Sequence, residues 1–174
     1  MSKIYYIADL HLGHANIIRH SNRPFSSVED MDKTLIDNWN SVVTPEDHVY
    51  ILGDLMFKTD NPEDYLTQLK GHLHLIKGNH DKFIKDKKYQ KYFDSIDDYL
   101  RIQDGNSQVI LFHYPIAEWD GFYRNTIHLF GHIHNNENDA CKIMKKIPNC
   151  YNVGADLIGF TPRTLKEIIK IYHK

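Results

Sequence analysis

The sequence has few cysteines and no long apolar run, and these two absences exclude several classes of protein. Cys141 and Cys150 are the only cysteines among 174 residues and lack metal-ligand spacing, so we expect reduced thiols and no disulfide framework. No apolar stretch is long enough to span a bilayer, and Asp9 interrupts the short apolar run near the amino terminus. We therefore expect a cytoplasmic protein with neither a membrane anchor nor a signal peptide.

The chain also lacks an excess of charge of either sign. It carries 21 basic and 23 acidic side chains, which leave a formal charge of −2. Because a protein that binds nucleic acid or an anionic membrane usually has a basic surface, we expect no stable partner of either kind. The length fits a single domain over residues 1–174, which can bury a core without disulfides or metals. The oligomeric state is left open.

Strand-like and helix-like segments alternate in the first half of the chain. The most regular helical pattern spans residues 28–42, after a capping box formed by Ser26 and Glu29. The second half is mostly β-rich, with runs at SIDDYLRI, SQVILFHYP, TIHLF and CYNVG, a DGN turn at 104–106, and a last helix capped by Thr161 and Pro162. This order predicts an α/β sandwich.

Histidine is abundant, with 12 residues, and several of them follow apolar runs in small polar clusters. Because the loops at one end of the strands converge in an α/β sheet, these clusters predict a metal site. Residues two apart on an extended chain point to the same side, so paired ligands are expected from D-x-H and H-x-H. Glycines at 53, 78 and 131 allow a close backbone approach. The candidate ligands are Asp9, His11, Asp54, Asn79, His113, His132 and His134.

Seven protein ligands are too many for one metal but suit two metals that share a bridging carboxylate. The ligands are oxygen and nitrogen without thiolate, which favours Mn²⁺, with Fe and Zn²⁺ as alternatives. Two metals about 3.5–4 Å apart can clamp the attacking and leaving oxygens of a phosphoryl displacement. The expected substrate is therefore a phosphate ester.

The ordered motifs D-x-H, GD, GNHD, H and GHxH, from residue 9 to residue 134, resemble those of the calcineurin-like metallophosphoesterase family. The run from His14 to Val43 is similar to small bacterial and phage phosphoesterases of that family. The resemblance implies a four-layer αββα sandwich of two mixed β-sheets flanked by helices. It also implies that the first metal is held by Asp9, His11, Asp54 and His134, and the second by Asp54, Asn79, His113 and His132, with Asp54 bridging.

His80 is left over from the ligand set, and we interpret it as a general acid. A hydroxide that bridges the two metals could attack phosphorus, while the departing alkoxide needs a proton that an imidazole can supply. Protein phosphatases of this family read GDxxDRG, where the second acid orients the catalytic histidine. This chain reads GDLMFKT, so Asp81 or a backbone carbonyl is expected to orient His80, and protein substrates are disfavoured.

Other polar residues allow two interpretations each. Arg23 could bind the substrate phosphate or be a solvated loop cation, and Asn16 and His14 could line the cleft, although a helix cap explains Asn16 equally well. Trp119 could stack on a nucleobase, but we favour core packing. We assign the remaining histidines to ordinary surface or core positions; these are His20, His48, His72, His74, His128 and His173.

Two functions from different classes fit these observations. The first is a dinuclear metal-dependent phosphoesterase, a phosphatase or phosphodiesterase, that acts on a small phosphorylated or nucleotide-like substrate. The second is a non-catalytic scaffold of the same fold that binds proteins. The filled ligand positions favour the enzyme.

Overall fold

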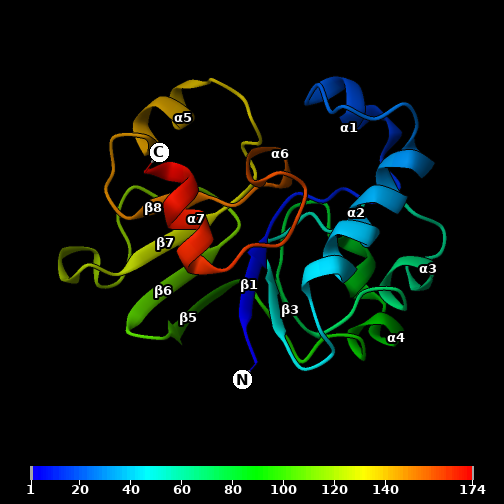
Figure 1. The fold of residues 1–174 in the computed structure, drawn as a ribbon, viewed down its shortest axis with the longest axis horizontal. Coiled ribbons are helices and arrows are strands. Elements are labelled where there is room, and N and C mark those ends of the chain that lie inside the picture. The colour runs from blue at the N-terminus through cyan, green and yellow to red at the C-terminus, as the bar shows by residue number, and fades with distance from the viewer. Residues whose placement is uncertain (1, 174) are drawn as a thin grey trace.

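In the computed structural model, which describes residues 2–173, eight strands form two four-stranded sheets (Figure 1). The first sheet is parallel throughout and has the order β1 (Ile4–Ile7), β2 (His48–Ile51), β3 (His72–Ile76) and β4 (Ser95–Asp97). The second has the order β5 (Tyr99–Asp104), β6 (Ser107–Phe112), β7 (Ile127–Phe130) and β8 (Cys150–Asn152). Only the β5–β6 pair is antiparallel, so the second sheet is mixed as expected, whereas the expectation of a mixed first sheet was wrong.

Helices cover the outer faces of both sheets, which confirms the predicted four-layer αββα sandwich (Figure 1). The first sheet is covered by α1 (Ala15–His20), α2 (Val28–Val42), α3 (Glu63–Leu66) and α4 (Lys87–Gln90), with a 3₁₀ turn at Lys82–Lys85. On the side of the second sheet lie α5 (Asp139–Met144), α6 (Ala155–Ile158), α7 (Leu165–Tyr172) and a 3₁₀ turn at Phe122–Arg124.

The alternation of side chains along each strand divides the core into three layers. In β1, Tyr5 and Ile7 pack against the helices of the first sheet, whereas Tyr6 packs between the two sheets. In β6, Val109 and Leu111 face the first sheet, and Ile110 faces outward onto a third cluster that contains Trp119. Trp119 is buried and its indole N–H donates to the carbonyl of Thr126, so core packing is the correct interpretation of this side chain.

Three local predictions differ from the structure. The run SIDDYLRI is divided at Asp98 into β4 and β5, because the chain crosses there from the first sheet to the second. Helix α2 has the predicted bounds, but Ser27, not Ser26, caps it by accepting the backbone N–H of Asp30. The last helix begins at Leu165 behind a capping box of Thr164 and Glu167, three residues later than expected.

The two sheets are joined where their carboxyl ends meet. The backbone N–H of Ala8 donates to the carbonyl of Val153, and the N–H of Ala155 donates back to Ala8, both at 2.9 Å. This junction brings the loops after β1, β2 and β3 close to those after β6, β7 and β8. Within residues 2–173, none of the helices combines the length and apolar character that a bilayer crossing requires, and both cysteines are free.

Candidate metal centre

The predicted ligands come together at this junction, each in the loop that follows the carboxyl end of a strand. Two groups of three can each converge on one point, because one donor atom from every member lies within 4.8 Å of the others. The first group, which we call the β1 triad, is Asp9, His11 and His134. The second, the β2 triad, is Asp54, His113 and His132. The division between the two groups matches the division that the resemblance implies.

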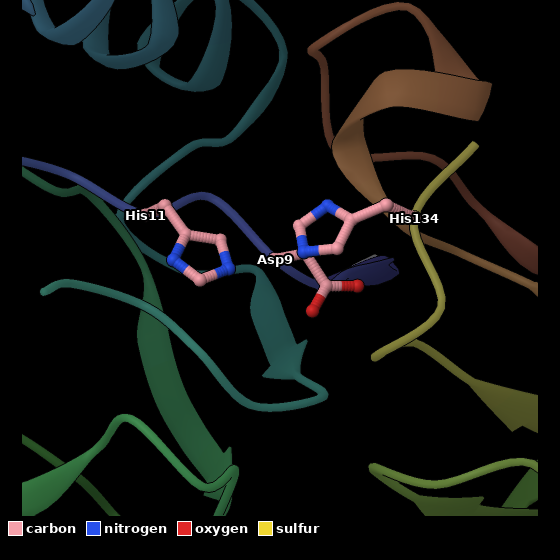
Figure 2. Close-up of side chains that lie close together, drawn as sticks. All are labelled: Asp9, His11 and His134. Atoms are coloured by element: carbon pink, nitrogen blue, oxygen red, sulfur yellow. The ribbon is translucent and has the colours of Figure 1, made fainter. Parts of the chain in front are cut away.

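In the β1 triad, the imidazoles of His11 and His134 flank the carboxylate of Asp9 (Figure 2). Their ring centroids lie 5.0 Å apart. Burial raises the pKa of Asp9 to about 8 and lowers the pKa of His11 to about 2. Ionising a carboxyl group that is buried in this way is costly, and a bound cation would offset that cost.

In the β2 triad, a hydrogen bond to the backbone fixes the orientation of His113. Its Nδ1 donates to the carbonyl of Leu52 at 2.7 Å, so Nε2 points into the site, where it lies 3.2 Å from Oδ1 of Asn79. Histidine ligands of metals commonly use the second ring nitrogen in this way. Burial lowers the pKa of His113, which favours the neutral form that a metal requires.

Asp54 connects the two triads. Its Oδ2 lies 3.6 Å from Nε2 of His11 and also 3.6 Å from Nε2 of His113. Nε2 of His11 is buried and has no hydrogen-bond partner among the described residues. An unpaired buried nitrogen beside a carboxylate is destabilising unless a further group binds there, and a divalent cation fits both the charge and the donor types.

The ligand loops are tightly turned, and three glycines make this possible. A Cβ at Gly131 would lie 2.5 Å from the Asp9 carboxylate, and one at Gly78 would lie 2.3 Å from that of Asp54. Gly53, with φ of +86°, passes equally close to His113. The predicted need for a close approach is therefore confirmed at these positions.

The backbone at the ligands is not extended, although the prediction from the two-residue spacing assumed an extended chain. Five of the ligands have left-handed φ values between 50° and 70°; they are Asp9, His11, Asp54, His132 and His134. His132 and His134 belong to different triads instead of serving one metal together, whereas Asp9 and His11, with the same left-handed conformation, belong to one. The structure therefore corrects the reason that we gave for the H-x-H pairing.

Asp81 has a different role from the one predicted. Its carboxylate accepts the backbone N–H groups of Asp54, Leu55 and Gly78 at 2.8–2.9 Å, and no hydrogen bond joins it to the imidazole of His80. Burial raises the pKa of Asp81 to about 6. Asp81 therefore holds the loop that carries Asp54, and it does not orient His80.

His80 lies at the mouth of the site and is positioned by packing. Its side chain is 35% exposed, and its Nε2 lies 3.9 Å from Asp54 Oδ2, too far for a hydrogen bond. The ring of Phe57 meets it edge-on at 4.8 Å, and the ring of His11 lies 5.4 Å away. Phe57 thus supports His80 by contact at the place where the protein-phosphatase motif has a different sequence.

Arg23 does not reach the cleft, contrary to the predicted substrate contact. Its side chain is fully buried and pairs with Asp156 at 2.7 Å. It also donates to the backbone carbonyls of Asp9 and Leu10 at 2.6 and 2.8 Å. With these partners the guanidinium holds the first ligand loop in place, and no part of it is available to a phosphate.

Asp156 is a residue that the sequence analysis missed. One carboxylate oxygen accepts Nε of Arg23, and the other accepts Nδ1 of His134 at 2.8 Å. Burial alone would lower the pKa of His134, but the hydrogen bond to Asp156 and the negative charges of Asp9 and Asp156 together raise that pKa. The sequence contained a signal, since Gly154-Ala155-Asp156 follows β8 as Gly53-Asp54 follows β2.

Of the two residues that were expected to line the cleft, His14 does so and Asn16 does not. His14 stacks on Phe57 with ring centroids 4.0 Å apart, and its Nδ1 lies 3.4 Å from that of His11, so it lines the site. Burial lowers the pKa of His14 to about 4. Asn16 is exposed in the first turn of α1, without a hydrogen bond to any candidate ligand and without a capping role.

Comparisons with known proteins show relatives along the whole chain, although no family model matches it. The chain is 37% identical over 177 residues to the uncharacterized protein MJ1445 of Methanocaldococcus jannaschii, a match that takes in 100% of this chain and 93% of that protein. It is 30% identical over 134 residues to the gene 66 protein of Mycobacterium phage L5, with 66% of this chain and 64% of that protein covered.

A solved structure has the same fold along nearly the whole chain. The protein of unknown function AQ665 from Aquifex aeolicus superposes with a TM-score of 0.77 at 29% identity, and the match covers 98% of this chain and 100% of that one. These relatives establish the family and the fold, while the chemistry has to be argued from the side chains of the site.

Proposed function

The chain belongs to the same family as the uncharacterized protein MJ1445, and we propose that it is a dinuclear metal-dependent phosphoesterase. The proposed substrates are small phosphate monoesters or diesters, such as nucleotides. The observation that carries the proposal is the position of Asp54 Oδ2, which is 3.6 Å from a histidine nitrogen of each triad. A carboxylate between two sets of oxygen and nitrogen donors is what two neighbouring divalent cations require.

Two divalent cations would supply Lewis acidity to phosphoryl oxygens and lower the pKa of a bound water. The β1 triad with Asp54 would hold one cation, and the β2 triad with Asn79 would hold the other. Mn²⁺ is the proposed metal, and Fe and Zn²⁺ also suit these donors. Asp81 accepts the backbone N–H of Asp54, and Asp156 accepts Nδ1 of His134. Both hydrogen bonds leave the metal-facing atoms of Asp54 and His134 free.

His80 can deliver the proton that a poor leaving group needs. Its side chain is partly exposed beside Asp54 and is not hydrogen-bonded to another side chain within the described chain. The imidazole is therefore free to hold a proton and to pass it to an oxygen that leaves from the site. His14 and Phe57 form the wall behind it.

A hollow of about 550 Å³ adjoins Asn79 and suits the rest of a small anionic substrate. Lys82 and Lys85 line it, and neither forms an ion pair with another described residue. Tyr114, also in the lining, is 36% exposed and packs against His132 at 4.6 Å. Two free ammonium groups and an aromatic ring favour a substrate with a second anionic group and a flat ring.

The direct test is hydrolysis of a nitrophenyl phosphate monoester and diester by the purified chain, with and without Mn²⁺. We expect metal-dependent turnover, close to two equivalents of bound metal, and loss of both properties in Asp54→Asn. Asp37→Asn, which removes an exposed acid on α2, is the matched control and should retain both. Full metal binding without turnover on any phosphoester would instead favour the non-catalytic scaffold.

A further inference from the structure

A second group of histidines lies at the opposite end of the first sheet from the candidate metal centre. His48 begins β2 and His72 begins β3, with His74 two residues further along. Their neighbours Val49, Leu73 and Leu75 pack against the helices, so the histidines lie on the sheet face that turns toward the second sheet. Asp94 directly precedes β4, the next strand in the sheet.

Three donor atoms of this group converge. Nδ1 of His48 lies 3.0 Å from Nε2 of His74. One ring nitrogen from each of these histidines and one carboxylate oxygen of Asp94 lie within 4.8 Å of one another. The strands fix this arrangement, because His48 pairs in register with His72, and His74 with Ser95. The sheet therefore holds His48 and His74, and Asp94 lies in the bend directly before β4, where its backbone N–H donates to the carbonyl of Leu73 at 2.8 Å.

The second nitrogen of His74 has a partner of the kind that metal ligands use. Nδ1 of His74 lies 3.0 Å from Oγ of Ser95. In the tautomer in which Nδ1 donates to this hydroxyl, Nε2 carries a lone pair directed at His48. Tyr50 stacks on the other side of the His74 ring, with centroids 4.5 Å apart, and limits its rotation.

The carboxylate of Asp94 is also held in place. Its Oδ2 accepts Nδ1 of His72 at 2.8 Å, and the ring of His72 stacks on that of His48 with centroids 4.9 Å apart. The side chains of His72 and Asp94 are 47% and 51% exposed, so water and ions can reach the group.

We propose that His48 Nδ1, His74 Nε2 and the Asp94 carboxylate bind one divalent cation of the Zn²⁺ type. Zn²⁺ binds imidazole nitrogen at about 2.0–2.1 Å in a tetrahedron, which places two such nitrogens roughly 3.3 Å apart. The two nitrogens face each other at 3.0 Å, with ring centroids 5.3 Å apart, so both rings must turn outward for their lone pairs to meet at one ion. Two histidines and a carboxylate leave a fourth position for water, which the exposure of the site allows. The bound ion would cross-link β2, β3 and β4 at their amino ends.

The competing explanation is a simple hydrogen bond in which one imidazole N–H donates to the other nitrogen. The two explanations differ in what Zn²⁺ does to the rings. A cation must displace the shared proton, so the ring-nitrogen resonances of His48 and His74 should move together on titration. A hydrogen bond without metal affinity leaves them unchanged.

The experiment is a titration of the ¹⁵N-labelled full chain with Zn²⁺, combined with metal analysis after dialysis. We expect His48 and His74 to respond, while His20, an exposed histidine on α1, does not. The double variant His48→Gln/His74→Gln should hold one equivalent of Zn²⁺ fewer than the parent chain, and His20→Gln should hold the same amount. Asp94→Asn alters only an exposed side chain and should lower the affinity of this site for Zn²⁺ by more than about tenfold.

These outcomes separate the proposal from the proposed phosphoesterase activity, because none of them depends on turnover. An unchanged Zn²⁺ stoichiometry in the double variant would overturn the proposal. So would ring resonances of His48 and His74 that stay in place when the parent chain is saturated with Zn²⁺. If the double variant does not fold, the affinity of Asp94→Asn and the titration of the parent chain decide the question.

Discussion

The molecule contains two pairs of histidines spaced two residues apart, and their backbones differ. His132 and His134 follow β7 and Gly131, and both have left-handed φ values. His72 and His74 lie within the regular β3 strand. The two imidazoles after β7 belong to two different triads, whereas the strand keeps both rings on one face, beside partners on neighbouring strands. The same spacing therefore gives different arrangements of donors at the two places.

The largest contrast should come from changing one member of each pair to glutamine. His132→Gln removes a ligand of the β2 triad, so we expect loss of the second metal and a fall of activity to the uncatalysed level on every substrate. His72→Gln removes a residue that contacts only the far end of the sheet and should leave kcat/KM within about twofold, as for other surface substitutions. Assays of both variants with metal analysis make the comparison. Equal losses in the two would show that stability, not ligation, is being measured.

The next effect distinguishes His80 from the ligands of the β1 and β2 triads. His80→Asn should keep both metals, because His80 belongs to neither triad. The loss of a general acid is typically worth about 10²–10⁴-fold, and it should be large for alkyl phosphates and smaller for nitrophenyl esters, whose leaving group departs as an anion. The measurement is kcat for the two leaving-group classes. A loss of metal, or equal slowing of both classes, contradicts the assignment.

The residues behind each pair provide a matched test of smaller size. Asp156 supports His134 from behind, and Ser95 supports His74. Asp156→Asn should weaken metal binding at the β1 triad by about 10–100-fold and lower activity at limiting metal, as outer hydrogen-bond partners of metal ligands usually do. Ser95→Ala should weaken Zn²⁺ binding at the far end of the sheet and leave activity unchanged. Activity loss in Ser95→Ala would mean that the two ends are coupled.

Arg23 can be tested in the same way, because it pairs with Asp156, the residue that supports His134. Arg23→Met leaves the buried Asp156 carboxylate with His134 as its remaining partner. Breaking a buried ion pair by removing one member typically destabilises a protein by about 3–5 kcal/mol. Lys33 and Asp37 form an exposed ion pair, so Lys33→Met should change stability by less than about 0.5 kcal/mol. Denaturant unfolding of the two variants tests this difference. A stable Arg23→Met variant with a raised KM would restore the phosphate-binding interpretation.

The smallest expected effect is in the hollow beside Asn79, next to the candidate metal centre. Lys82 and Lys85 are exposed, so each should contribute only about 0.2–1 kcal/mol to binding a second anionic group. Lys85→Ala should therefore raise KM by about fivefold or less for a substrate with two phosphates, and should not affect one with a single phosphate. Steady-state kinetics on the two substrates makes the measurement, and Lys142→Ala on α5 is the control.

The local pattern of the sequence predicted the strands, the main helix and the convergence of the ligand loops, because these depend on short-range periodicity and on the ends of strands. It did not predict the role of Arg23, because burial of a guanidinium depends on a partner 133 residues away. It also did not predict the contact between His48 and His74, since only the pairing of β2 with β3 brings them together. Asp81 was misassigned for a similar reason, as its three backbone partners come from two loops.

The left-handed turns of the candidate metal centre have a consequence for anyone who engineers this protein. A residue other than glycine in that conformation is strained by roughly 1 kcal/mol, somewhat less for aspartate and histidine, which tolerate it better than most. Glycine would relieve the strain at Asp9, His11, Asp54, His132 or His134 and remove a ligand at the same time. A directed-evolution campaign that selects only for heat resistance would therefore be drawn toward these five positions. Variants from such a library should be screened for metal content as well as for melting temperature.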